Sequence, residues 1–362
     1  MRHWLIVLFY LCFACFATTA QAQLFRSNKP KLPDSLFIKN YLNRLNVSTG
    51  VQINNVEFIL AYPQFKQRFD ISPKVTMQQF FKLEFRQINL RYSYSLFPLT
   101  KKADAPTNFR KEFGFSFGVK KFDFDLSFQN ARGYFLRNSE EVLAGTNLAG
   151  QTLQFPNLRT RVFALQVSYN TNSQFSLNSL STGKELQIRN AYSFLPGTSF
   201  YRIHFFQEDQ TPQPGLSSDD YIIDWNLNLP LAATLVLPHN WYLTGIAGPI
   251  LGVSFLDTKT YDPGLQKISD RNTRFTNGYY LRAGLGFTGQ KWFGGIEAYN
   301  TRYGSASEAG RNTRFFYGAK FYVGLRLRPP KILKQTAEIL PYDENGLKLG
   351  KKPKSKSPQQ NN

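Results

Sequence analysis

Hydrophobic and polar residues alternate with a period of two along most of the chain after residue 43. In the stretch 75–96 the hydrophobic residues stand at odd positions as far as Phe85 and at even positions from Ile88 onward, with Arg86-Gln87 between them. The same change of parity occurs across Lys120-Lys121. Because successive side chains of a strand point to opposite faces, a change of parity across two polar residues predicts a tight turn between two antiparallel strands.

Further alternating segments predict a series of such hairpins. The last segment runs from Phe315 to Leu327 and stops at Pro329-Pro330, which cannot continue a ladder. Short turns at one end and long polar loops at the other are typical of a transmembrane β-barrel. The expected short connections are 86–87, 120–121, 170–173, 238–240 and 288–291, and the long ones are 97–111, 137–159, 208–220, 257–274 and 303–312.

Two segments leave the number of strands open. Residues 174–207 form either one long strand or three short ones, and residues 44–60 contain a bulge or a turn at Asn54-Asn55. With 44–60 as one strand, the two choices for 174–207 predict about twelve or fourteen strands. We therefore predict an all-β fold, a transmembrane antiparallel up-and-down β-barrel of about 12 strands (10–14), with short periplasmic turns and longer outer loops.

The two parities of each predicted strand differ in chemistry. One carries Phe, Tyr, Leu and Val and is expected to face lipid, whereas the other carries charged, polar or glycine residues and is expected to face the lumen. Both signs of charge fall on neighbouring strands, which predicts ion pairs in a narrow lumen or a selective lining in a wider one. The predicted lumen-lining charges are Lys82, Glu84, Arg91, Asp123, Asp125, Arg282, Lys320 and Arg326.

The two ends of the chain lack this alternation. Residues 1–22 combine a positive start, an apolar run and the cleavage pattern Ala20-Gln21-Ala22, which predicts a signal peptide. Both cysteines of the sequence lie within it, so the exported protein is predicted to contain no disulfide. We expect residues 23–43 to be a periplasmic lead, 44–327 the barrel and 328–362 a basic, disordered tail.

Composition agrees with an exported barrel. The sequence has 44 Lys and Arg against 24 Asp and Glu, 16% aromatic residues and a mean hydropathy of −0.35. This polar average excludes a bundle of membrane-spanning helices, each of which needs about 20 apolar residues in a row. Because the chain is predicted to be exported, its positive charge does not indicate nucleic-acid binding. The lysines of the tail are expected to be solvated or to contact an anionic periplasmic partner.

Candidate catalytic chemistry is sparse. A Ser-His-acid hydrolase needs a histidine beside its nucleophile, and after signal removal His204 and His239 are the histidines that remain. His239 falls in a predicted short turn. His204 lies near the outer end of a predicted strand and is a weak catalytic candidate, with an interfacial or lumen-facing histidine as the alternative. The predicted mature chain has no cysteine and no paired histidines, so we predict no metal site and no cofactor.

Three groups of residues carry a resemblance. They are Asp34-Ser35-Leu36-Phe37-Ile38 followed by Tyr41, Asp125 to Gln129 followed by Arg132 to Leu136, and Phe175-Ser176-Leu177 with Gln187 and Ala191 to Gly197. In these the chain resembles an uncharacterised family of Bacteroidota cell-envelope proteins, catalogued as a domain of unknown function and regarded as outer-membrane β-barrels. The resemblance covers roughly residues 34–327. It implies a barrel in the outer membrane and implies no activity.

We therefore expect a non-enzymatic outer-membrane barrel that acts as a pore, a small-ligand transporter or a structural envelope protein. The alternatives are a lipid-acting hydrolase that uses His204 and a scaffold that recruits a periplasmic partner through its basic tail. The expected partners are outer-membrane lipid and lipopolysaccharide and the barrel-assembly machinery, and no nucleic acid.

Overall fold

The computed structural model describes residues 34–98, 109–119, 121–147, 149–179, 183–207, 217–261, 267–307, 310–333, 342–343 and 346–347. The predicted signal peptide, residues 23–33 of the lead and most of the basic tail lie outside these residues. No helix in the described ranges has the length and apolar character needed to cross a membrane.

The strands are β1 (Ile38–Asn40), β2 (Leu45–Tyr62), β3 (Gln67–Pro73), β4 (Thr76–Phe85), β5 (Ile88–Pro98), β6 (Phe109–Val119), β7 (Phe122–Leu136), β8 (Gln154–Tyr169), β9 (Glu185–Gln187), β10 (Ala191–Phe194), β11 (Gly197–Gln207), β12 (Ser217–Asn228), β13 (Leu231–Leu237), β14 (Trp241–Tyr261), β15 (Lys267–Thr288), β16 (Trp292–Ser307), β17 (Gly310–Leu327), β18 (Tyr342–Asp343) and β19 (Gly346–Leu347), with one short helix, α2 (Ser139–Val142).

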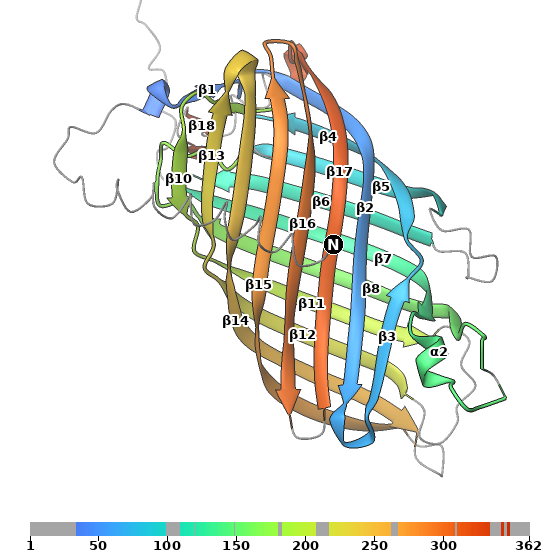
Figure 1. Ribbon diagram of the computed structural model, residues 1–362. Coiled ribbons are helices and arrows are strands. Elements are labelled where there is room, and N and C mark those ends of the chain that lie inside the picture. The colour runs from blue at the N-terminus through green and yellow to red at the C-terminus, as the bar shows by residue number, and fades with distance from the viewer. Residues whose placement is uncertain are drawn as a thin grey trace, which may run out of the picture.

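Twelve strands close into one antiparallel ring. The order around it is β2-β4-β5-β6-β7-β8-β11-β12-β14-β15-β16-β17, and β17 returns to pair with β2 from Arg311↔Ala61 to Leu327↔Leu45. Figure 1 shows the strong tilt of the strands, because β15 to β17 at the front cross β6 to β8 at the back at a steep angle. The predicted all-β antiparallel barrel is confirmed, and so is a strand number of twelve.

In the barrel wall, hydrophobic and polar side chains alternate between the outer and the inner face as the sequence pattern predicts. On β4 the side chains of Phe81 and Leu83 are on the outside, with 50% and 49% of the residue exposed, whereas Glu84 is 1% exposed. Lys82 lies on the same inner face as Glu84. Other residues that leave an apolar side chain exposed on the outside are Leu90, Tyr92, Phe113, Phe122, Phe128, Leu243, Leu285 and Phe321. The predicted separation of an apolar outer face from a polar inner face is therefore correct.

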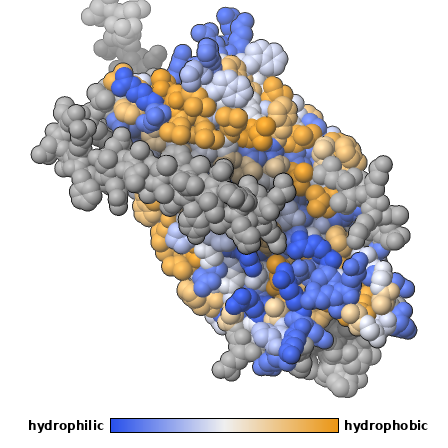
Figure 2. Space-filling view, in the orientation of Figure 1, coloured by the Kyte–Doolittle hydropathy of each residue, from blue (hydrophilic) through white to orange (hydrophobic). Residues whose placement is uncertain are grey.

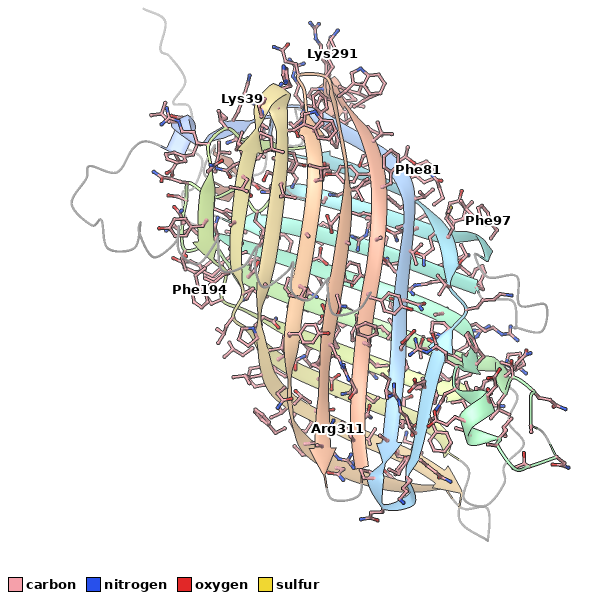
Figure 3. The ribbon with its side chains drawn as sticks, in the orientation of Figure 1. Lys39, Phe81, Phe97, Phe194, Lys291 and Arg311 are labelled. Atoms are coloured by element: carbon pink, nitrogen blue, oxygen red, sulfur yellow. The ribbon has the colours of Figure 1, made fainter. Side chains whose placement is uncertain are left out.

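The outer surface is banded along the barrel axis. Hydrophobic residues cover the wall toward the end with short turns, and hydrophilic residues gather around the end that carries α2 (Figure 2). Figure 3 shows Phe81 and Phe97 projecting from the wall, while Lys291 lies at the short-turn end and Arg311 at the opposite, long-loop end. A belt of apolar side chains between two polar ends is the surface that a bilayer requires.

The predicted tight turns lie at one end of the barrel. β4 and β5 are joined through Phe85↔Ile88, and β6 and β7 through Val119↔Phe122. The turn at 238–240 is a 3₁₀ turn in which His239 and Asn240 have φ angles of 60° and 63°. His239 is thus a turn residue, as predicted.

Two of the predicted long loops are wrong. β14 and β15 remain paired as far as Tyr261↔Lys267, within the predicted loop 257–274, and β16 and β17 as far as Ser307↔Gly310, within 303–312. Polar residues continue the wall beyond its apolar belt at these places. Strands outside hydrocarbon need no apolar face, so the loss of alternation there was misread as the end of the strand. Most of the predicted loop after β5 lies outside the described residues. The predicted loop 137–159 ends earlier than expected, because β8 begins at Gln154, and α2 lies within it.

The segment 174–207 is neither one strand nor three strands of the wall. β11 is its wall strand and pairs with β8 and β12. The short strand β10 pairs instead with β13, and β9 pairs with β1 of the N-terminal lead. The strand predicted at Phe175 and Leu177 is not formed, because this part of the chain turns into the end of the lumen and packs there against side chains rather than in a ladder.

At the long-loop end of the barrel a different set of strands forms the wall. β3 pairs with β2 through Phe58↔Ile71 and with β7 through Ile71↔Leu136. In this way β3 takes the place that β4, β5 and β6 hold in the rest of the ring, and Figure 1 shows the ends of β5 and β6 turned away from it. The sequence did not predict β3, whose residues alternate too irregularly to stand out.

Close approach of strands makes one glycine indispensable. Gly50 of β2 lies opposite Tyr322 of β17, and a Cβ at this position would collide with the carbonyl oxygen of Phe321. A Cβ at Gly245 of β14 would meet no heavy atom within 4 Å.

We expect Gly50→Ala to lower the free energy of unfolding by about 1–3 kcal/mol, because the methyl group forces two strands apart. Urea unfolding of the refolded barrel, followed by tryptophan fluorescence, measures the change. Gly245→Ala is the matched control and should shift the free energy by less than about 0.5 kcal/mol. Equal effects of the two substitutions would contradict the packing explanation.

Candidate functional site

The lumen holds one cavity of about 330 Å³ among the described residues. Its lining comes from almost every strand of the ring and from the segment between β8 and β10. We call this cavity the chamber. It lies between two barriers, one at the short-turn end and one toward the long-loop end, which are described in turn.

The first barrier is the inner segment, defined as residues 172–179 and 183–190. Phe175 and Gln187 are buried, and the Gln187 side-chain oxygen accepts a hydrogen bond of 2.7 Å from the backbone N–H of Ser176. Phe175 belongs to an apolar cluster with Leu195 and Ile246 of the surrounding wall. Leu177 and Asn178 face the chamber and form one end of it.

Two lumen-lining charges predicted from the sequence hold this segment. The Glu84 carboxylate accepts a hydrogen bond of 2.9 Å from the backbone N–H of Gly183, and the Arg326 guanidinium donates to the Gly183 carbonyl oxygen at 2.8 Å. Arg326 also lies over the ring of Tyr41, at 4.0 Å from its centroid. The inner segment is thus fixed mainly by side chains and by the short β1–β9 pairing, not by the ring ladder.

A lysine is buried in the same segment, outside the spanning strands. Lys184 is 1% exposed, and its carbonyl oxygen accepts a hydrogen bond from the backbone N–H of Tyr41 at 2.6 Å. Burial lowers the pKa of the Lys184 ammonium to about 8, although the nearby Glu84 carboxylate opposes the shift. The segment therefore keeps an ionisable group in place at a desolvation cost.

The second barrier is an aromatic layer. Phe58 of β2 and Phe205 of β11 lie with ring centroids 5.3 Å apart, although these two strands are on opposite sides of the ring. Nearer the chamber, Phe316 of β17 stacks on Tyr201 of β11 at 5.5 Å and on Tyr303 of β16 at 5.8 Å. Rings from opposite walls thus meet across the lumen and obstruct it.

A fully buried ion pair anchors this layer. The Arg314 guanidinium lies 3.0 Å from the Asp224 carboxylate, and their side chains are 1% and 0% exposed. The Tyr303 hydroxyl donates to the same carboxylate oxygen at 3.0 Å, and Arg314 donates to the Ser254 hydroxyl at 3.0 Å. These contacts hold Tyr303, a member of the aromatic layer, in one position.

Most predicted lumen charges are paired on the chamber wall. Lys82 contacts Glu84 at 2.5 Å, and Arg91 contacts Glu112 at 2.7 Å. Arg282 and Lys320 both contact Glu297, each at 2.9 Å. These ion pairs join β5 to β6, and both β15 and β17 to β16, while Lys82 and Glu84 pair within β4.

Asp123 and Asp125 differ from the other predicted charges. Both line the chamber from β7, and no hydrogen bond or ion pair links either one to another of the described residues. Gly118 and Ser116 on β6 and Ser168 on β8 are small neighbours across the strands, and Gln166 on β8 stands beside Asp125. Two carboxylates are thus left facing open space.

Sequence reasoning missed four members of this interior. Glu112 stands at the edge of a predicted loop, and Glu297, Asp224 and Arg314 lie on strands whose inner parity was not followed. Continuing the parity of Gly114 and Ser116 back by one step would have found Glu112. The pairing of Asp224 with Arg314 joins β12 to β17 across the lumen, and no pattern within one strand signals it.

His204 lies on the outer face of the wall, not in the lumen. Its Nε2 is 3.1 Å from the Asp219 carboxylate, and its ring is stacked between Phe206 at 4.3 Å and Tyr221 at 4.1 Å. In the described part of the chain no serine or threonine hydroxyl contacts the ring. The Gly-x-Ser-x-Gly pattern at 114–118 supplies none, because it lies inside β6 with Ser116 facing the chamber.

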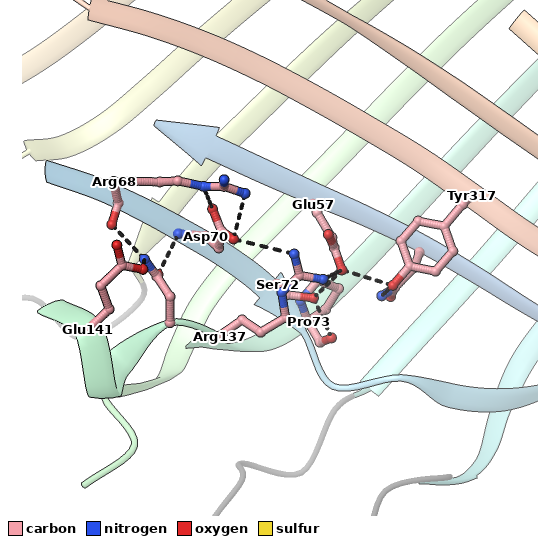
Figure 4. Close-up of polar contacts among 10 residues, drawn as sticks. Glu57, Arg68, Asp70, Ser72, Pro73, Arg137, Glu141 and Tyr317 are labelled. Carbon is pink, nitrogen blue, oxygen red and sulfur yellow. Dashed lines mark hydrogen bonds and ion pairs between the residues drawn. The ribbon is translucent and has the colours of Figure 1, made fainter. Parts of the chain in front are cut away.

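A polar cluster on the outer face braces the entry of β3 into the wall. The Glu57 carboxylate accepts hydrogen bonds from the Tyr317 hydroxyl at 2.8 Å and from Ser72 at 3.1 Å, and Arg137 reaches both Glu57 and Asp70 (Figure 4). Glu57, Asp70 and Ser72 are buried. These contacts tie β3 to β2, β17 and β7 where β3 replaces three strands, so we read the cluster as structural.

The described residues contain no group of three or more His, Cys, Asp or Glu that could hold a metal ion.

Comparison with known proteins places the chain in a family. The family described as "Domain of unknown function (DUF4421)" matches residues 32–326, so the chain belongs to it. No curated protein sequence matches the chain.

Solved structures with a similar fold share little sequence. The outer membrane protease OmpT from Escherichia coli is 9% identical with a TM-score of 0.36, over 80% of this chain and 98% of that one. The β-domain of the Bordetella autotransporter BrkA is 12% identical with a TM-score of 0.35, over 76% and 99%. The toluene transporter TodX of Pseudomonas putida is 9% identical with a TM-score of 0.27, over 79% and 90%. Similarity at this level does not extend to function.

We expect Asp224→Asn to lower the free energy of unfolding by about 3–5 kcal/mol, because it leaves the buried Arg314 guanidinium without its counter-charge. Asp257→Asn is the control, since Asp257 contacts the exposed Arg271 and should cost at most about 1 kcal/mol. Urea unfolding of both variants tests this. A loss at Asp224 no larger than the loss at Asp257 would contradict the buried-pair explanation.

Proposed function

We propose that this member of the DUF4421 family is a non-enzymatic barrel of the outer membrane that binds a small polar solute in its chamber and passes it between two barriers. The observation that carries the proposal is the chamber of about 330 Å³, whose lining includes residues of both the inner segment and the aromatic layer. A ring of strands with a packed interior would serve a structural role. A chamber lined by charged and tyrosine side chains is the kind of site that holds a solute.

The outer-membrane location rests on the surface and the predicted export signal. A sheet can cross hydrocarbon only if it closes, and this sheet closes through β2 and β17. The exposed aromatic and aliphatic side chains form the belt that lipid would cover. The first ring strand begins and the last ring strand ends at the short-turn end, where Leu45 pairs with Leu327, and this end is proposed to face the periplasm.

The two barriers favour gated passage over an open pore. The inner segment is held by side-chain and backbone contacts, among them those of Glu84, Arg326 and the β1–β9 pairing, and not by the ladder of the ring, so it can move without opening the ring. The aromatic layer stands on ring strands, so it can open only by rotation of side chains such as Phe205 and Phe316. Passage then requires both barriers to open.

A basic and aromatic band on the outer wall supports contact with lipopolysaccharide. Arg161 lies 4.9 Å from the ring centroid of Phe206, and Lys259 lies 4.9 Å from that of Tyr221. Cations held on aromatic rings near the long-loop end suit phosphorylated headgroups. Insertion by the barrel-assembly machinery and an anionic partner for the tail stay predictions.

A lipid-acting hydrolase is the second candidate, and the His204–Asp219 contact is the observation in its favour. His204 is stacked against Phe206 and Tyr221, and among the described residues no serine or threonine hydroxyl contacts its ring nitrogens. We therefore favour an interfacial role for this histidine.

In planar bilayers we expect the refolded full-length chain to give no step currents. Replacing residues 172–188 by a flexible linker of equal length should also give none, because the aromatic layer still closes the lumen, and the same holds for Phe205→Ala with Phe316→Ala. The variant that combines the linker with both Phe→Ala substitutions should give step currents, because the inner segment and the aromatic layer close the lumen in series and both have to be removed. The control adds Phe321→Ala, on the lipid face, to the linker variant. Currents from the unmodified chain, or silence of the combined variant, would contradict the proposal.

For the hydrolase alternative, we expect wild type and His204→Ala to release fatty acid from phospholipid vesicles at the same background rate. Activity of the wild type that His204→Ala abolishes would replace the non-enzymatic proposal with the hydrolase. A melting curve of the variant confirms that its barrel is intact.

A further inference from the structure

We infer that the chamber binds a small zwitterion, with the cationic group of the ligand at Asp123 and Asp125 and its anionic group at Lys320 and Arg282. The inference rests on the proposed function, because it names the chemical class of the solute. It is drawn from the charges that the interior leaves unbalanced and from where they stand in the ring.

The acidic side of the chamber is β7. Asp123 and Asp125 are next to each other on its inner face, and neither has a hydrogen-bonding or ionic partner among the described residues. Their cross-strand neighbours are Gly118 and Ser116 on β6 and Ser168 and Gln166 on β8. The Arg91 and Gln87 side chains lie over Gly114 and Gly118, and both carboxylates line the chamber. Two adjacent carboxylates facing open space suit an ammonium group, which donates three hydrogen bonds.

The basic side of the chamber stands opposite. In the ring of twelve, β16 is the strand farthest from β7, and β15 and β17 flank it. Arg282 of β15 and Lys320 of β17 both line the chamber and share the single carboxylate of Glu297. Two cations on one anion leave a positive charge in excess, and this charge faces Asp123 and Asp125 across the chamber.

Charge balance favours a zwitterion over a simple ion. Lys82 is offset by Glu84 and Arg91 by Glu112. The remaining acids are on β7, and the remaining positive charge lies on β15 and β17, with that of Arg110 on β6 nearby. A simple cation would satisfy the acids and face repulsion from the opposite wall, and a simple anion would meet the reverse. A molecule with both groups pairs one charge with each wall, and this pairing offsets the cost of removing its two charges from water.

The aromatic surfaces set the character of the rest of the ligand. Tyr280 of β15, Tyr299 of β16 and Phe316 of β17 line the chamber on its basic side. Such surfaces accept a short uncharged side chain and exclude bulk water. An amino acid with an uncharged side chain has this combination of groups, so L-glutamine is a suitable probe.

The test loads the chamber during refolding, because both of its ends are closed in the folded protein. The full-length chain is refolded with radiolabelled L-glutamine, freed of excess label, and counted. Parallel samples receive 4-aminobutanamide, which lacks the carboxylate, or glutaramate, which lacks the amine. We expect L-glutamine to be retained at least about tenfold more than either analogue, as expected for the loss of one charged hydrogen-bonding group.

Variants locate the two ends of the ligand. Asp123→Asn with Asp125→Asn, and separately Lys320→Met, should each lower glutamine retention at least about tenfold. Asp219→Asn, on the outer wall, is the matched control and should retain as much as the wild type. Ser127→Leu narrows the same space without changing charge, so it tests the site even if the aspartate variant fails to fold.

Several results would overturn the inference. The first is that the wild type retains no L-glutamine. The second is that 4-aminobutanamide is retained as well as L-glutamine and Lys320→Met has no effect on retention. The third is that Ser127→Leu retains as much L-glutamine as the wild type. These are separable from a failure of the proposed function. If the combined barrier variant conducts while no zwitterion is retained, the zwitterion inference fails alone. If that variant is silent while glutamine is retained, passage fails and binding stands.

Discussion

In hydrocarbon, a backbone N–H or C=O without a partner costs several kcal/mol, by order of magnitude, and the architecture depends on removing every such group. β17 pairs with β2 along its whole length, so no ring strand has a free edge in the apolar belt. The same requirement explains β3: where β4, β5 and β6 turn away, β3 pairs with both β2 and β7. The buried cluster around Glu57 and Asp70 ties that replacement strand to its neighbours.

The number of strands in the closed ring, twelve, also sets the width of the lumen and how far side chains can fill it. About eight strands leave a lumen that side chains fill, and about 16–18 leave an aqueous channel. At twelve, long side chains from opposite walls meet, as Phe58 meets Phe205, while short ones leave space, as around Asp123. The lumen is therefore filled in layers, and the chamber is the layer where the wall of β6 to β8 carries glycine, serine and alanine.

The charges of the lumen divide into those that support the fold and those left for a ligand. A buried charge that loses its partner is costly, so Arg314 and Asp224 are best understood as part of the wall. The carboxylates of β7 form no ion pair or hydrogen bond with another described residue, and Arg282 and Lys320 on the opposite wall share one carboxylate. His204 shows the converse: a histidine beside an acid on the lipid face has aromatic neighbours and no substrate-sized space.

The sequence by itself determined the strands of the wall, their inner and outer faces and most of the short turns, because each depends on alternation within a few residues. It identified Lys82, Arg91, Asp123 and Arg282 as lumen residues for the same reason. The tertiary structure decided which charges pair, where rings cross the lumen and that the inner segment enters its end. These features join residues far apart in the chain, whose distances are set by the closure and tilt of the ring and leave no trace in local alternation.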